Sequence, residues 1–333
     1  MNKFVIALSL FLVGCQLGGT TPTPGPQFYA TGTQGLDVRV NTLSNNQLFM
    51  CEEGEVLLDL HNLGTSDIAQ GIYTLTIEDQ ILKPVGKTKK QGSYSLEGRS
   101  AVNPVGGYTQ LGFRFKTNNL PAQLETYQTP FIFNACYPYA TSANIPVCID
   151  PTRDPQAARS CKTTPVSGKG GQGAPVLVTL VEPLMVVQDN AVLPTFIVHI
   201  ANAGKGRVVS TDSLGFACGN GGGTPSSKVR VMAQLQDEQL KCLPEMVDLR
   251  QGETKVTCMS NTYFGAAEGR ANQGTFTTPL TVQLEYGYVT TLFYPFTITR
   301  LAHQEDCSST QETYTPSTVS TSTDRGINWP PRS

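Results

Sequence analysis

Short runs of alternating apolar and polar residues, separated by Gly, Pro and Asn, predict an all-β protein with two tandem immunoglobulin-like β-sandwiches. An internal repeat is the evidence for two units. Thr129–Thr141, with the sequence TPFIFNACYPYAT, aligns without gaps to Thr278–Thr290, with the sequence TPLTVQLEYGYVT. Earlier in each unit, VLLDLHNLG at 56–64 parallels FIVHIANAG at 196–204. Each unit is therefore expected to hold a strand that ends in Asn-x-Gly and, later, a strand that carries Tyr-x-Tyr.

The composition of the remaining segments sets the expected boundaries. Residues 15–27 and 302–333 are rich in Thr, Ser, Gly and Pro and show no periodicity, which is typical of a flexible tether and a disordered tail. We expect a signal peptide at 1–14, the tether at 15–27, a first sandwich at 28–150, a linker at 151–172, a second sandwich at 173–301 and the tail at 302–333.

The N-terminus carries a short apolar run after Lys3 that ends at Cys15. The run is too short to span a bilayer and is typical of a secretory signal. Residues 12–15, Leu-Val-Gly-Cys, resemble the lipobox of lipoprotein precursors, which implies that Cys15 is lipidated and becomes the mature N-terminus. The alternative is a plain signal peptide with an incidental cysteine. The first interpretation predicts a membrane partner, held through lipid on Cys15, and a cell-surface location.

The chain has nine cysteines, so lipidation of Cys15 leaves eight, an even number in an exported protein, where disulfides persist. Alternation places Cys136 on the outer face of the repeated strand and Cys148 on the outer face of the next expected strand, at 144–150, and a hairpin turn near Ser142 would bring them together. We therefore predict a Cys136–Cys148 disulfide. Two further predicted pairs are Cys242–Cys258, across a turn, and Cys161–Cys218. Cys51 and Cys307 are left over, and they pair differently or between molecules.

The net charge of −2, with 15% charged residues and no basic run, argues against nucleic acid as a partner. Gly168–Gly173 matches G-x-G-x-x-G but precedes a strand, so it is interpreted as a linker and not a phosphate loop. No cofactor, metal centre or catalytic residue is predicted, because the three histidines lie in unrelated segments. Calcium binding by Asp150 and Asp154 is left open.

The strand that ends in Asn-x-Gly resembles the second strand of the cell-adhesion-related domain of bacteria and archaea, often abbreviated CARDB. The segments CYPYAT, PVCIDP, GQGAPV and LEYGY, in this order, resemble those of uncharacterised exported lipoproteins of small-genome archaea. This resemblance implies a fold and a location, and no activity.

Two function classes follow from the sequence. The first is a non-enzymatic surface protein that binds a protein partner or an envelope component, or associates with itself through strand edges. The second is a carbohydrate-binding or accessory domain of a surface hydrolase system. Exposed aromatic platforms would favour the second class, but alternation assigns four repeated tyrosines to the core: Tyr137, Tyr139, Tyr286 and Tyr288.

Overall fold

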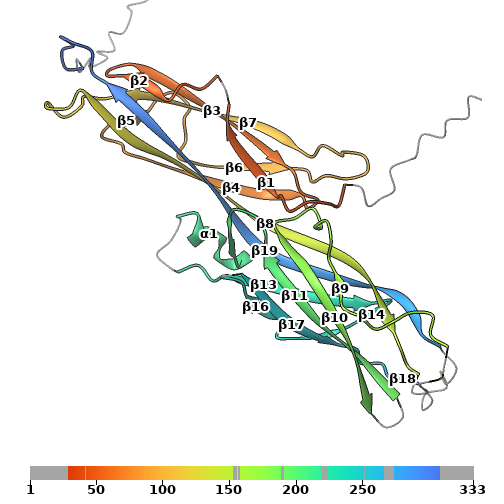
Figure 1. Cartoon of the computed structure of the whole chain (residues 1–333). Coiled ribbons are helices and arrows are strands. Elements are labelled where there is room, and N and C mark those ends of the chain that lie inside the picture. The colour runs from red at the N-terminus through yellow and green to blue at the C-terminus, as the bar shows by residue number, and fades with distance from the viewer. Residues whose placement is uncertain are drawn as a thin grey trace, which may run out of the picture.

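The computed structural model describes residues 29–307, apart from 42, 153–155, 157, 189–190, 220–223, 251 and 266–273. Cys15 and the tail beyond Cys307 lie outside the described residues, so the predictions made for them stay predictions. The described chain is almost entirely β-structure, arranged in antiparallel sheets with one short helix, as predicted. Figure 1 shows an elongated body of two lobes that meet at a waist. No helix among the described residues is long and apolar enough to cross a bilayer.

The strands fall into two groups along the chain. Those of the first half are β1 (Leu36–Val40), β2 (Gln47–Phe49), β3 (Glu53–Asn62), β4 (Ile68–Ile77), β5 (Leu82–Pro84), β6 (Gln91–Leu96), β7 (Tyr108–Thr117) and β8 (Thr126–Ile149). Those of the second half are β9 (Val166–Ser167), β10 (Val176–Gln188), β11 (Ala191–Asn202), β12 (Arg207–Val209), β13 (Lys228–Leu235), β14 (Glu238–Gln239), β15 (Lys241–Leu243), β16 (Met246–Asp248), β17 (Glu253–Met259), β18 (Phe264–Gly265) and β19 (Phe276–Thr299). A 3-10 turn, η1 (Thr211–Ser213), leads into helix α1 (Leu214–Ala217).

The two longest strands form a continuous ribbon. β8 and β19 have 24 residues each, and they pair antiparallel from Thr126 opposite Thr299 to Ile149 opposite Phe276. At about 3.3 Å per residue the ribbon is roughly 80 Å long. It runs through both lobes, as Figure 1 shows.

Each lobe packs a separate sheet against one half of this ribbon. In the first lobe, the sheet β1-β3-β7-β5 covers the start of β8 and the end of β19, which are flanked by β4, β6 and β2. In the second lobe, the sheet β15-β17-β11-β10-β9 covers the end of β8 and the start of β19, which are flanked by β13 and β14. One cluster of buried apolar side chains runs through both lobes. Neither lobe is closed by strands from one half of the chain alone, and whether each is an immunoglobulin-like domain stays a prediction.

The orientation predicted for the repeated strands is confirmed. Phe131, Phe133 and Ala135 are fully buried, as are Leu280, Val282 and Leu284 in the second repeat. In the first lobe the rings of Phe113 and Phe131 meet edge-on across the two sheets, with centroids 6.0 Å apart. Alternation along the strand was therefore sufficient to identify its core-facing side.

The predicted Cys136–Cys148 disulfide is wrong, because β8 does not turn at Ser142. β19 pairs with β8 without a break, so these two cysteines lie twelve residues apart along one extended strand. Cys136 instead bonds Cys218, which also overturns the predicted Cys161–Cys218 pair. Cys218 follows α1, which lies over the outer face of the ribbon at the waist.

The other cysteines also pair within the chain. Cys242 and Cys258 lie opposite each other on β15 and β17 and form the predicted disulfide. Cys148 bonds Cys161 in the following loop. Four disulfides are typical of an oxidising, extracytoplasmic compartment.

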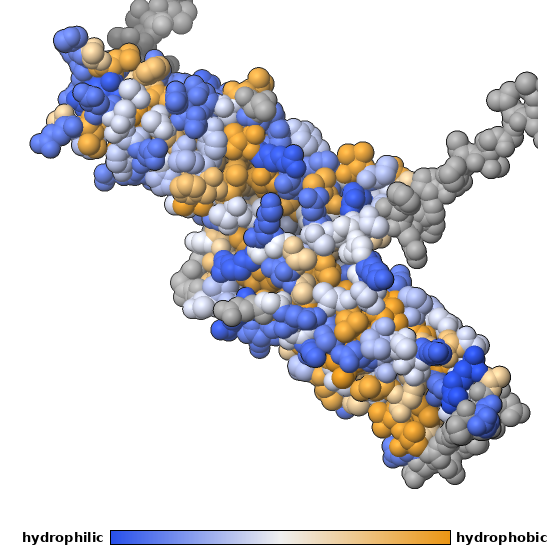
Figure 2. Space-filling view, viewed as in Figure 1, coloured by the Kyte–Doolittle hydropathy of each residue, from blue (hydrophilic) through white to orange (hydrophobic). Residues whose placement is uncertain are grey.

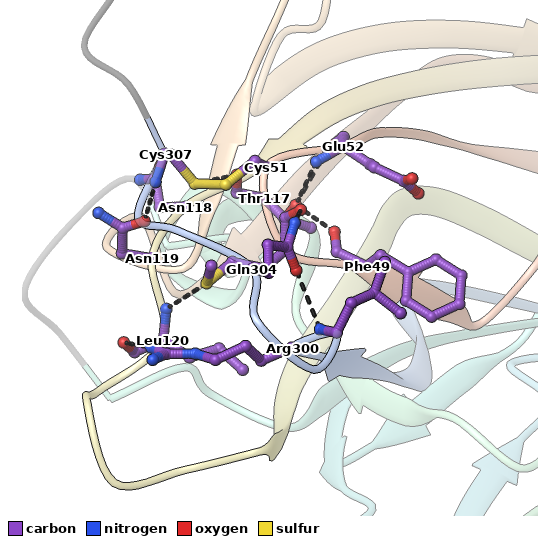
Figure 3. Close-up of a disulfide and its surroundings, with 12 residues drawn as sticks. Phe49, Cys51, Glu52, Thr117, Asn118, Asn119, Leu120, Arg300, Gln304 and Cys307 are labelled. Atoms are coloured by element: carbon purple, nitrogen blue, oxygen red, sulfur yellow. Dashed lines mark hydrogen bonds between the residues drawn. A yellow bond between two sulfur atoms is a disulfide. The ribbon is translucent and has the colours of Figure 1, made fainter.

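The fourth disulfide joins Cys51 and Cys307 to each other, so the expectation that they pair differently or between molecules is wrong. Cys51 bonds Cys307, 256 residues later, at the end of the first lobe (Figure 3). The segment after β19 is held there by further contacts: the Gln304 side chain donates to the Met50 carbonyl at 2.7 Å, and the Arg300 side chain donates to the Leu120 carbonyl at 2.7 Å. The described chain therefore ends at the tip of the first lobe, far from the waist.

Candidate functional site

The four repeated tyrosines meet at the waist and form what we call the tyrosine junction: Tyr137, Tyr139, Tyr286 and Tyr288. The sequence repeat aligns Pro138 with Gly287, and the strand register places the same two residues opposite each other. The ribbon therefore has a local two-fold axis at this pair. Neighbouring tyrosine rings lie 5.5 to 6.3 Å apart between centroids.

The hydrogen bonds of the junction repeat across this axis. Tyr139 donates to Asn62 Oδ1 at 3.0 Å, and Tyr288 donates to Asn202 Oδ1 at 3.1 Å. Each asparagine also accepts a bond from the backbone N–H of the glycine in its Asn-x-Gly turn. Within each repeat, the Tyr-x-Tyr strand is thus bonded to the Asn-x-Gly turn of that same repeat.

Burial raises the pKa of all four hydroxyls, that of Tyr288 to about 12. The hydroxyls therefore stay protonated and serve as fixed donors. The junction is a structural centre, as the sequence predicted when it assigned these rings to the core.

Replacing Tyr139 with phenylalanine is expected to lower the free energy of unfolding by about 1–2 kcal/mol, because Asn62 is fully buried and loses one donor. The same change at Tyr288 should cost less, since Asn202 is only half-buried and water can replace the hydroxyl. Urea denaturation of the two variants measures the difference. Equal losses would show that burial of the asparagine does not control the cost.

The remaining predicted candidates have structural roles. The glycines of the 168–173 loop hold the N-terminal segment: Gly32 N–H donates to Gly170 O at 2.7 Å, and Gly173 N–H donates to Gly32 O at 2.9 Å. Gly170, Gly171 and Gly173 have positive φ, which favours glycine. Asp150 accepts from Arg159 Nε at 2.8 Å, while Asp154 lies outside the described residues. No group of three metal-ligating side chains occurs within the described ranges.

His61 and His199 contact different groups in different lobes. His61 bonds the Val105 carbonyl through Nε2 at 2.9 Å. His199 lies on the outer face of the second lobe, and its side chain is buried between two carboxylates: Nε2 is 2.5 Å from Glu182 Oε1, and Nδ1 is 3.2 Å from Glu253 Oε1. This contact ties β10, β11 and β17 together.

An unpaired strand edge lies at the far end of the second lobe. β9 pairs with β10 only at Leu180 and Val181. Beyond this point, Glu182–Gln188 pairs with β11 on one side, and no strand of the described chain pairs with its other side. We call these seven residues the β10 edge.

The direction of its backbone groups follows from neighbouring bonds. Ser260 N–H donates to Pro194 O at 2.9 Å, so the backbone groups of Pro194 point toward β17. Its partner on β10, Met185, then points its own N–H and C=O away from β11, and Val187, two residues on, does the same. Pro183 shares this orientation, so its missing N–H leaves the bonds to β11 intact. The β10 edge therefore offers Met185 and Val187 as donors and acceptors to an incoming strand.

Apolar side chains surround this edge. Leu184 is 43% exposed, Val186 45% and Val187 56%. Figure 2 shows hydrophobic surface gathered at the lower end of the second lobe, where Figure 1 places the end of β10. Natural sheets usually protect such edges with charges or short strands, because an exposed apolar edge invites another strand to pair. This edge was not among the predicted features, although Pro183 within an apolar run is a signal for an edge strand.

A second surface feature lies on the outer face of the first lobe. Asp59 accepts three side-chain hydrogen bonds: from Tyr108 at 2.6 Å, from Gln110 at 2.8 Å and from Asn41 at 2.9 Å. The ring of Tyr108 is 57% exposed. Asp59 and Tyr108 border a cavity of about 250 Å³, whose other lining residues are Asp37, Arg39, His61 and Leu63.

The hydrogen bond from Tyr108, with that from Gln110, holds the pKa of Asp59 below its ordinary value. A lowered pKa in the folded state means that this contribution to stability is present above the ordinary pKa of aspartate and is lost as pH falls through the folded value. We expect the Asp59→Asn variant to lose stability relative to the parent at neutral pH, and this difference to shrink in acid. Thermal unfolding between pH 7 and pH 2 measures it; a difference that is independent of pH would contradict the assignment.

No protein-family model matches this chain, and no curated protein matches it significantly.

Proposed function

We propose that this protein acts at the cell surface by binding a partner and holding it in place, without catalysing a reaction. The β10 edge is its binding element. The single observation that carries the proposal is the β10 edge, a largely apolar strand edge of seven residues at the end of the second lobe, with which no strand of the described chain pairs. Strand addition supplies affinity through main-chain hydrogen bonds and specificity through alternate side chains. The β10 edge supplies both: Met185 and Val187 direct their backbone groups away from β11, and the side chains of Leu184, Val186 and Val187 are exposed.

The proposal includes attachment of the chain to the membrane through lipid on Cys15. The described chain begins at Tyr29 and enters at the waist, where Gly32 is held by the 168–173 loop and Thr31 O accepts from Arg99 at 2.6 Å. From this point the second lobe extends away as a continuous sandwich (Figure 1). A tether at the waist would leave the β10 edge accessible at the end of that lobe.

The test is crosslinking of the full chain in intact cells, followed by mass spectrometry, with two variants at one position. Val187→Pro removes the N–H that points to the free edge without removing a bond to β11. Val187→Ala also shortens the side chain but keeps this N–H. We expect the crosslinked partner to be lost with proline and retained with alanine. Reproducible hydrolysis of glycosides, esters or peptides, abolished by one His or acidic substitution, would contradict the binding-only proposal.

The exposed ring of Tyr108 favours carbohydrate binding as a second candidate function. Sugars stack on aromatic rings and bond to carboxylate and guanidinium groups, and Tyr108, Asp59 and Arg39 supply these groups around one cavity. NMR titration of the protein with surface glycans tests this site. Shifts that are lost in Tyr108→Ala would support it, whereas no shift at millimolar glycan would exclude it.

A further inference from the structure

We propose that the β10 edge binds the C-terminal tail of a second copy of this chain, so that the protein assembles head to tail. The proposal rests on the proposed function, since it names the occupant of the same edge. The segment concerned is Ser317–Thr323, with the sequence STVSTST, which lies in the tail beyond the described residues.

The tail segment matches the edge in length and chemistry. It has seven residues between Pro316 and Asp324, and the β10 edge also has seven. It contains no proline, glycine or charge, and its Thr and Val residues favour extended structure. An uncharged strand can lie on the apolar edge without burying an unpaired charge.

The position of the tail excludes capture by its own molecule. The tail starts at Cys307, which is bonded to Cys51 at the tip of the first lobe (Figure 3). A strand rises about 3.3 Å per residue. Thr299 therefore lies about 40 Å from the waist along β19, toward the tip of the first lobe. Glu182 lies about 20 Å from the waist along β10, in the opposite direction. Ser317 follows Cys307 by ten residues, which span at most about 36 Å. The segment of the same chain therefore falls well short of the roughly 60 Å that it must cross.

The two ends of the molecule are then complementary and different. The first lobe donates a strand, and the second lobe accepts one at the opposite end (Figure 1). Such a contact joins unlike surfaces and leaves one free end on each side, so it propagates as an open chain of molecules. The Cys51–Cys307 disulfide fixes the base of the donated tail to the first lobe, so that tension on the tail is transmitted to the sheets of that lobe.

The test uses the full chain with Cys15→Ser, analysed by light scattering after size exclusion at increasing concentration. We expect oligomers that grow with concentration. Val187→Pro, which changes the edge, and Val319→Pro, which changes the tail, should each leave monomers, while Val187→Ala and Val319→Ala should still assemble. An equimolar mixture of the two proline variants should form one-to-one dimers and nothing larger, because the mixture contains one intact edge and one intact tail per pair.

Three results would overturn the proposal. The first is a full chain that stays monomeric at all concentrations, and the second is a mixture of the proline variants that forms no dimer. The third is assembly of Val319→Pro equal to that of the parent, which would point to pairing between two β10 edges. If the chain does not assemble, but crosslinking in cells still finds a partner that Val187→Pro abolishes, the tail proposal fails and the proposed function stands. If Val187→Pro changes neither readout, both fail.

Discussion

Replacing Gly64 with alanine is expected to destabilise the protein by about 3 kcal/mol, the upper part of the range for overpacking a closed site. A Cβ at this position would meet the Tyr139 hydroxyl and would lie 2.6 Å from the Gly173 carbonyl oxygen and 2.7 Å from that of Gln34. Two of these three atoms belong to the backbone and cannot rotate away. The change would therefore separate the Asn-x-Gly turn from the tyrosine junction and from the 168–173 loop.

The matched control is Gly215→Ala. Gly215 lies in α1, and a Cβ there has no neighbour within 4 Å. Alanine should be neutral or stabilise by up to about 1 kcal/mol, because it favours helix. Chemical denaturation of both variants gives the comparison, and a loss at Gly64 no larger than at Gly215 would show that the waist is not closely packed.

Removal of the Cys51–Cys307 disulfide, by changing both residues to alanine, is expected to cost about 5.5 kcal/mol of unfolding free energy in the chain-entropy description. This bond joins residues that are 256 positions apart in the sequence, whereas Cys242 and Cys258 are 16 positions apart. The corresponding double change at Cys242 and Cys258 should cost about 3 kcal/mol, since a shorter loop loses less entropy in the unfolded chain.

Denaturant unfolding of the two double variants measures both losses under oxidising conditions. The order of the losses is the informative result, because it compares two disulfides in one protein. A larger loss for the Cys242–Cys258 pair would mean that contacts at β15 and β17, and not the entropy of the long loop, set the stability.

Alternation in the repeated strands was enough to predict the core. Phe131, Phe133, Leu280 and Val282 face inward because successive side chains of a strand point to opposite sides, and this rule needs no knowledge of the partner strand. The same rule placed Cys136 on the outer face correctly. It could not show what covers that face, because Cys218 arrives from a loop 82 residues later.

The extent of β8 could not be predicted from its own residues. Ser142 and Asn144 are common in turns, so a hairpin there was a reasonable expectation. In the structure they are opposite Gln283 and Thr281 of β19, and the long-range pairing overrides the local preference. The predicted Cys136–Cys148 pair requires this turn, so without the turn the two cysteines cannot meet.

The features of the candidate site also depend partly on local sequence and partly on long-range strand pairing. Pro183 in an apolar run is a local signal for an edge, which the predictions did not use, but that this edge is free depends on β9, which ends its pairing at Val181. The cavity beside Tyr108 depends on three strands that are adjacent only in the folded sheet, β1, β3 and β7. Both features are made by neighbours distant in sequence.

Native-state hydrogen exchange, measured by mass spectrometry at increasing denaturant, tests most directly whether the two lobes are one body joined by the ribbon. The informative variant is Phe131→Ala, which removes a fully buried ring from the first lobe. Because β8 and β19 belong to both lobes, we predict that amides of β11, in the second lobe, lose protection together with those of β3, in the first. Loss of protection in the first lobe alone, with β11 unchanged, would contradict a shared ribbon and would show two independent domains.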